Sequence, residues 1–205
     1  MKVLARTWIF TQITVATVLY CGDVMSAEKA PDTELQDVVQ AGDKLLAFKK
    51  MDGSNDGEEG AAAIVRHSEP DANGNTCELL ILQRTASEWV VKERSGSIVD
   101  CLFNDLARNA RDLSANLTVS EGKINYVNQA ARSNVTFEIR YDRAKSTWFL
   151  FEARSASPFE NPKTGKMGVV MGRARFPDEI PFTPLSKIDP EALQAIMDKH
   201  PKTLD

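Results

Sequence analysis

Alternating apolar and polar positions run through most of the chain and predict antiparallel β-structure. The clearest alternation covers residues 134–141, where Val135, Phe137, Ile139 and Tyr141 fall on one face of an extended strand. Shorter runs of β character lie at residues 44–49, 61–66, 77–83, 88–92, 97–102, 116–119, 123–127 and 147–153. Turn residues separate these runs at the short intervals typical of all-β domains. The pattern therefore predicts a mainly β fold, an antiparallel sandwich or barrel-like domain.

Helical spacing appears only at the two ends of this pattern. Residues 33–42 are predicted as a short N-terminal helix that ends at Gly42. Residues 190–199 are predicted as a C-terminal helix, because Asp189 can cap the first turn and Pro190 suits the first position. The apolar residues at helical spacing are Leu35, Val38 and Val39 in the first helix and Ala192, Leu193, Ile196 and Met197 in the second.

The N-terminal residues 1–27 have the three parts of a secretory signal peptide. A basic start precedes a mainly apolar stretch of about a dozen residues, and small residues follow it. We expect cleavage after Ala27, which leaves residues 28–205 as a single β-rich domain of the bacterial periplasm. The alternative is a lipoprotein cut before Cys21. The apolar stretch is too short for a membrane-spanning helix, which needs about 20 residues.

The charge balance argues against two classes of partner. The chain carries 25 basic and 29 acidic side chains, a net charge of −4. Removal of residues 1–27 takes away two basic side chains and one acidic side chain, so the net charge of the expected mature domain is −5. A mildly acidic domain has no overall basic field for nucleic acid or anionic lipid. Its charge would instead attract a basic protein partner.

Cys77 and Cys101 are the two cysteines of the expected mature domain. An even pair of cysteines in an oxidising compartment is most simply a disulfide. The loop that this bond closes, about 25 residues, would stabilise the fold by about 3 kcal/mol, mainly by restricting the unfolded chain. The alternative is two separate buried thiols.

The sequence offers few side chains for catalysis. The two histidines, His67 and His200, have no spacing that builds a metal pair or a base for a nucleophile, and no G-x-S-x-G motif is present. Carboxylates are numerous, which leaves a two-carboxylate hydrolase as an alternative, but none lies in an apolar context that marks a catalytic acid. We therefore interpret the protein as a binding protein and not as an enzyme.

The acidic, glycine-rich segment at residues 52–60 has part of the order of a calcium-binding loop. The candidate oxygen ligands at its first, third, fifth and seventh positions are Asp52, Ser54, Asp56 and Glu58. The closing carboxylate is missing, because Gly60 and Ala63 stand at the ninth and twelfth positions. We therefore expect no cofactor unless this loop binds calcium weakly. The alternative is a solvated acidic turn between two strands.

Two loops are candidates for contact with a partner. Ser95, Gly96 and Ser97 form a small polar segment that could offer hydroxyl groups to the active site of a partner. The alternative is a turn that starts the next strand. Residues 156–166, with Phe159 between two prolines, could form a second contact loop or a partly buried connection.

The strands, the acidic loop and the two cysteines follow one another in an order that resembles a known family. The motifs that carry the resemblance are the D-x-[NS]-x-D-G loop at 52–57 and the strands at 77–82, 89–91, 98–101, 117–119, 136–142 and 148–150. They resemble bacterial periplasmic proteins and lipoproteins related to the invertebrate-type lysozyme inhibitors. Some members of this group are similar to immunity proteins against toxins that neighbouring bacteria inject. The resemblance spans about residues 35–190.

The resemblance implies a compact β domain that binds a peptidoglycan-degrading enzyme and blocks its cleft. The function expected from it is a periplasmic inhibitor or immunity protein whose partner is a basic peptidoglycan hydrolase or toxin. Ser95, Gly96 and Ser97 resemble the Ser-Gly loop that lysozyme inhibitors insert, although the tyrosine expected shortly afterwards is missing. The acidic loop has Gly60 where the family has a further aspartate. The alternative function is a calcium-stabilised cell-envelope accessory protein without inhibitory activity.

Overall fold

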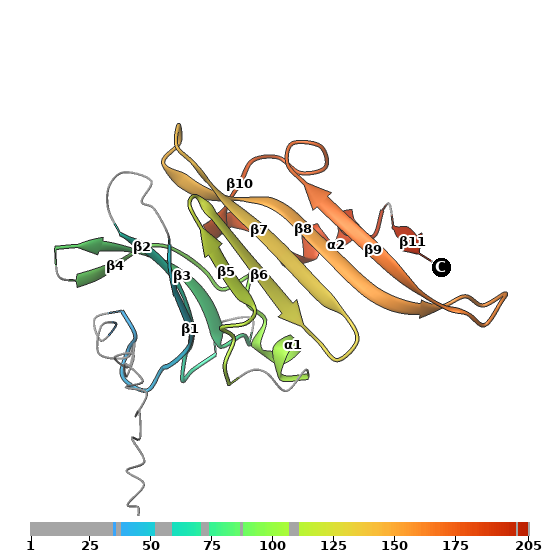
Figure 1. The fold of residues 1–205 in the computed structure, drawn as a ribbon, viewed down its shortest axis with the longest axis horizontal. Coiled ribbons are helices and arrows are strands. Elements are labelled where there is room, and N and C mark those ends of the chain that lie inside the picture. Colours follow the sequence, from blue (N-terminus) through green and yellow to red (C-terminus); the bar gives the residue numbers. More distant parts are fainter. Residues whose placement is uncertain are drawn as a thin grey trace, which may run out of the picture.

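The alternating segments form antiparallel strands that are arranged in two sheets (Figure 1). The computed structural model describes residues 35, 38–51, 59–70, 74–86, 88–106, 111–199 and 201–204. Within these residues the protein is mainly β, with antiparallel sheets and a C-terminal helix, so the predicted fold class is confirmed. The expected signal peptide lies outside the described residues.

The smaller sheet consists of four strands that follow one another in the chain. Its strands are β1 (Lys44–Lys50), β2 (Gly60–Arg66), β3 (Cys77–Thr85) and β4 (Glu88–Ser95), paired in that order. Every residue from Ala61 to Val65 in β2 is buried, because this sheet has apolar neighbours on both faces. One face packs against the larger sheet, and the other packs against Leu35, Val38 and Val39.

The larger sheet holds the remaining strands. They are β5 (Leu117–Ser120), β6 (Lys123–Gln129), β7 (Asn134–Asp142), β8 (Thr147–Glu160), β9 (Met167–Arg175), β10 (Thr183–Pro184) and β11 (Lys202–Leu204). Their order is β11-β9-β8-β7-β6-β5, and β10 pairs with the first part of the long strand β8. The far halves of β8 and β9 form a hairpin arm that extends away from the smaller sheet (Figure 1). Strands β9 to β11 were not predicted from the sequence.

A continuous apolar core joins the two sheets. The predicted inward positions of β7 are confirmed, because Phe137 and Ile139 belong to this core and Val135 and Tyr141 pack against it. The carboxylate of Glu93 in β4 also links the sheets, since it accepts hydrogen bonds from the Thr147 hydroxyl and from the backbone N–H of Trp148. The smaller sheet is thereby fixed against the start of β8.

The predicted strand at residues 97–102 is wrong. Residues 96–98 form a bend, and helix α1 (Cys101–Leu106) begins where the strand was expected to continue. The Asp100 carboxylate accepts a hydrogen bond from the Phe103 N–H, and side-chain amides from other segments bind the carbonyl groups of Ile98 and Val99. These backbone groups therefore need no strand partner.

The C-terminal helix was predicted correctly, and α2 (Pro190–Met197) is its observed extent. The Asp189 side chain accepts hydrogen bonds from two backbone N–H groups of the first turn, and Leu193 and Met197 are buried. A short 3-10 helix, η2 (Leu185–Lys187), precedes it. The N-terminal helix expected at 33–42 is described only at residue 35 and at 38–42, where the chain forms a turn that ends at Gly42 with a positive φ of 96°.

Candidate functional site

A groove of about 740 Å³ lies between the chain segment that follows β4 and helix α2. Strands β6 and β7 provide its floor through Asn128, Val135 and Phe137. One wall contains residues 96–103, and the other contains residues 188–197. The groove thus lies on the inner side of the larger sheet, where the smaller sheet no longer covers it.

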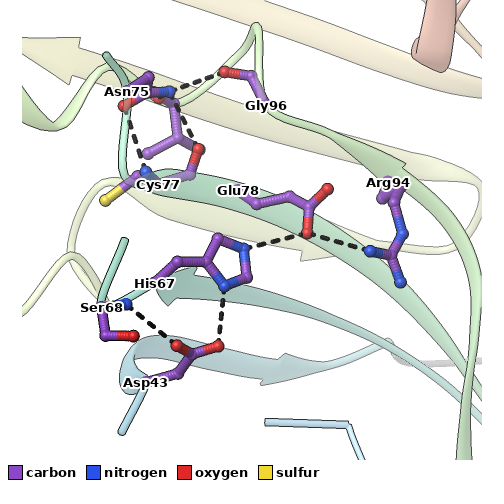
Figure 2. A network of polar contacts seen from close by, with 9 residues as sticks. Asp43, His67, Ser68, Asn75, Cys77, Glu78, Arg94 and Gly96 are labelled. Carbon is purple, nitrogen blue, oxygen red and sulfur yellow. Dashed lines mark hydrogen bonds and ion pairs between the residues drawn. The ribbon is translucent and has the colours of Figure 1, made fainter. Parts of the chain in front are cut away.

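Asn75 holds the first wall in place. Its amide nitrogen donates hydrogen bonds to the carbonyl oxygens of Gly96 and Val99 at 2.8 and 2.7 Å, and its amide oxygen accepts one from the Cys77 N–H (Figure 2). One side chain thereby ties the segment after β4 to the start of β3. A bend stabilised by hydrogen bonds in this way is preorganised for binding.

A second network of buried side-chain amides holds the same wall against strand β6. Asn104 is fully buried, and its amide donates to the Asp100 carbonyl, the Tyr126 hydroxyl and the Asn128 side-chain oxygen at 2.7–3.0 Å. Its own oxygen accepts from the Gln129 N–H at 3.0 Å. Burial raises the pKa of the Tyr126 hydroxyl far above its ordinary value, so this group stays neutral. The network joins α1 to β6.

The disulfide between Cys77 and Cys101 is confirmed. Its Cα atoms are 5.7 Å apart, and both cysteines are buried. The bond attaches the first residue of α1 to the first residue of β3. Covalent and hydrogen-bonded restraints therefore act on the same wall of the groove.

Helix α2 approaches the larger sheet closely at Gly172. A Cβ atom at this position would lie 2.7 Å from the Ser155 Oγ and 2.8 Å from both the Cβ and the carbonyl oxygen of Met197. The backbone oxygen cannot rotate away as a side chain can. Glycine at this position in β9 therefore sets the distance between α2 and the sheet, and with it the width of the groove.

Replacing Gly172 by alanine is expected to lower the free energy of unfolding by about 1–3 kcal/mol, because the added methyl group must displace α2. Urea unfolding of the wild-type and variant proteins measures this loss. Gly60→Ala is the matched control, since the nearest atom to its new Cβ is the flexible Met51 Sδ at 3.3 Å. An equal loss for the two substitutions would show that the contact with α2 does not determine the effect.

The lining of the groove is acidic and partly apolar. Asp100, Asp189 and Glu191 line it, and no lysine or arginine does so within the described part of the chain. Leu102 stands at the same wall as Asp100, with 70% of its surface exposed. An exposed leucine among carboxylates suits a ligand that has both basic and apolar side chains.

The predicted contact segment lies at this groove, but its three residues differ in accessibility. Ser95 is buried, and its hydroxyl accepts a hydrogen bond from the Ser97 N–H. Gly96 and Ser97 are partly exposed and line the groove. Ser97 and not Ser95 is therefore the hydroxyl that a partner can reach.

The predicted calcium ligands Asp52, Ser54, Asp56 and Glu58 lie outside the described residues. The loop that carries them joins β1 to β2, and the Met51 N–H donates a hydrogen bond to the Gly60 carbonyl across its base. Glu59, a further carboxylate beside the loop, forms ion pairs with Lys50 and Arg84. The calcium hypothesis stays a prediction from the sequence.

His67 bridges two carboxylates (Figure 2). Its Nδ1 is 2.7 Å from Asp43, and its Nε2 is 3.3 Å from Glu78, which also pairs with Arg94. The two ring nitrogens point in different directions, so the carboxylates do not converge on one metal position. The side of the ring where a nucleophile would need to lie faces Glu78 instead. We interpret this group as a bridge that links β1, β2 and β3.

Sequence reasoning did not single out the asparagines that build the groove wall. The signal for one of them was present, because Asn128 continues the inward-facing alternation of Ile124 and Tyr126 in β6. A polar residue at an inward position must find hydrogen-bonding partners. Most partners of Asn75 and Asn104 lie 21–25 residues away in the sequence, and alternation within one segment cannot reveal them.

The comparisons with known proteins add no relative to this description. No protein-family model, no curated protein and no solved structure matches this chain. The resemblance to lysozyme inhibitors therefore stays a prediction from the sequence. Among the described residues, no helix is long and apolar enough to cross a membrane.

Proposed function

We propose that the protein is a periplasmic inhibitor or immunity protein that binds a basic peptidoglycan hydrolase or toxin through the groove between residues 96–103 and α2. The observation that carries the proposal is the acidic lining of this groove, with Asp100, Asp189 and Glu191 and no cation among the described lining residues. Carboxylates arranged in this way attract a basic partner and raise its rate of association.

The rigidity of the groove wall supports the proposal. A binding protein loses less conformational entropy when its contact segment is already ordered in the free state. Asn75 and the Cys77–Cys101 disulfide restrain the wall, while Ser97 and Leu102 are accessible on it. Ser97 offers a hydroxyl to the partner, and Leu102 offers an exposed apolar contact.

The proposed test is binding of the exported and processed protein to a panel of lysozymes and to the product of the adjacent gene. Glu191→Lys is expected to weaken binding to the responsive hydrolase about tenfold at low salt, because it reverses a charge at the groove. Leu102→Ser is expected to weaken binding through the lost apolar contact. Surface plasmon resonance measures both effects, and cleavage of peptidoglycan measures inhibition.

Two control variants lie away from the groove. Glu88→Lys reverses an exposed charge at the start of β4, and Leu204→Ser removes an exposed leucine from β11. Both controls are expected to bind like the wild type. No binding to any hydrolase at micromolar concentration, together with no protection of cells that express a periplasmic hydrolase, would contradict the proposal.

A further inference from the structure

The outer face of the larger sheet, opposite the groove, presents a group of cations. Cross-strand pairing puts Lys123 beside Arg140, and Arg154 beside Arg173. Arg175 lies on the same face of β9 as Arg173, because alternate residues of a strand share a face. Gly172, which contacts α2, points to the other face. We call the set Lys123, Arg140, Arg154, Arg173 and Arg175 the cationic face.

Two carboxylates on this face, Glu138 and Glu152, lie beneath the cations. Glu138 and Glu152 are directly opposite each other on β7 and β8, and their side chains are only 10% and 12% exposed. Arg140 and Arg154, which pair with them, are 43% and 51% exposed. Above these two carboxylates, a ligand that approaches the sheet therefore meets guanidinium groups first.

Glu138 stays ionised beneath these cations. Its burial, the largest single influence, raises the pKa of its carboxyl group, but the hydrogen bond and charge of Arg140 and the charge of Lys123 together outweigh that effect. The pKa of Glu138 is consequently held below its ordinary value. The cationic face thus has five positive side chains. Three carboxylates form ion pairs with them, namely Glu138, Glu152 and Glu179.

Aromatic stacking orients part of the cationic face. The guanidinium carbon of Arg140 lies 3.4 Å from the ring centroid of Phe151, and that of Arg175 lies 5.1 Å from the same ring. These contacts keep both guanidinium groups close to the Phe151 ring. Planar guanidinium groups held in this way can bind phosphate oxygens with two hydrogen bonds each.

Exposed apolar side chains continue the same face along the β8–β9 arm. Met167 and Val169 lie on the same face of β9 as Arg173, because alternate residues of a strand share a face, and they are 61% and 38% exposed. Leu204 of β11 pairs with Val169, so it lies on this face as well, and it is 57% exposed. The arm protrudes from the rest of the protein (Figure 1). We call these three residues the apolar arm.

We propose that the cationic face and the apolar arm together dock the protein on the surface of an anionic phospholipid bilayer. Cations near such a surface bind its headgroups, and exposed apolar side chains enter the boundary between headgroups and acyl chains. The apolar arm favours a lipid surface over a soluble polyanion, which offers no apolar phase. Docking by this face leaves the groove on the opposite side of the sheet open to solvent. The inference does not depend on the proposed function of the groove.

The net charge of the chain did not indicate this surface. A domain that is acidic overall was expected to offer no basic field to anionic lipid. The strands, however, place exposed cations on one face of the larger sheet, while the groove on the other face is lined by carboxylates. Net charge is a sum over the whole surface, whereas binding depends on the local arrangement.

The test is sedimentation of the exported and processed protein with vesicles of phosphatidylcholine alone and of phosphatidylcholine mixed with phosphatidylglycerol. We expect binding to the mixed vesicles only, with a loss of binding as the salt concentration rises. Arg154→Gln/Arg173→Gln is expected to weaken binding about tenfold. Met167→Ser/Val169→Ser is expected to weaken it without changing the salt dependence.

The control variant is Lys44→Gln/Lys49→Gln, which removes two exposed cations from β1 in the smaller sheet. It should bind vesicles like the wild type, and circular dichroism should show that all variants are folded. Equal binding to both kinds of vesicle, or an equal loss in the β1 control, overturns the inference. Binding to heparin without binding to vesicles also overturns it, because the partner would then be a soluble polyanion.

Discussion

Replacing Asn104 by alanine is expected to lower the free energy of unfolding by about 3–5 kcal/mol, because each buried polar group left without a partner costs about 1–3 kcal/mol. The substitution removes the hydrogen-bonding partner of the Gln129 N–H and of the buried Tyr126 hydroxyl. It also leaves a small cavity beneath α1. The wall of the groove loses its support at the same time, so affinity for a hydrolase partner should fall with stability.

Urea unfolding followed by tryptophan fluorescence measures this effect. Asn125→Ala is the matched control, because Asn125 lies on β6 next to Tyr126, with its side chain on the opposite face of the sheet, and is only partly buried. We expect the control to change the free energy of unfolding by about 0.5 kcal/mol or less. A loss below about 1 kcal/mol for Asn104→Ala would show that water or neighbouring groups replace its hydrogen bonds.

Removal of the disulfide by Cys77→Ala/Cys101→Ala is expected to destabilise the protein by about 3 kcal/mol. The two cysteines are 24 residues apart in the sequence, and without their bond the unfolded chain gains conformational freedom. The same change frees the start of α1 from β3. We therefore expect a groove with a more mobile wall and a faster dissociation of any partner that the groove binds.

Unfolding in urea with and without dithiothreitol measures this contribution. The reductant should lower the midpoint of the wild-type protein to near that of the double variant, and it should leave the midpoint of the double variant unchanged. A wild-type midpoint that is insensitive to complete reduction, verified by thiol titration, would contradict the expected stabilisation. Cys77→Ala alone serves as a second reference, because it breaks the bond and leaves one free thiol.

The elements that the sequence predicted well are those whose burial repeats regularly within one segment. Val135, Phe137 and Ile139 alternate with polar residues, and the observed strand β7 turns them towards the core. The helix that starts at Pro190 was also predictable, because its cap and its apolar stripe are local features. The cysteine pairing followed from the count of two cysteines in the expected mature domain.

The elements that the sequence did not predict depend on partners from distant segments. Strand β9 has glycine and alanine at its inward positions 172 and 174, where α2 and neighbouring strands leave little space. Small residues weaken the apolar alternation on which a strand prediction relies. Residues 97–102 include two β-branched residues, Ile98 and Val99, which favour a strand. Side-chain amides of Asn75 and Asn128 bind the carbonyl groups of these two residues, and helix α1 begins where a strand was predicted.

The sequence by itself determined the β class, the positions of most strands along the chain, the C-terminal helix and the cysteine pair, because local periodicity, local capping and the cysteine count encode these features. Only the tertiary structure decided where charge lies. The register of β7, β8 and β9 puts exposed arginines on one face of a sheet, and the packing of α2 leaves a groove lined by carboxylates on the other. Register and packing arise from contacts between distant segments, so no local pattern could reveal these two surfaces.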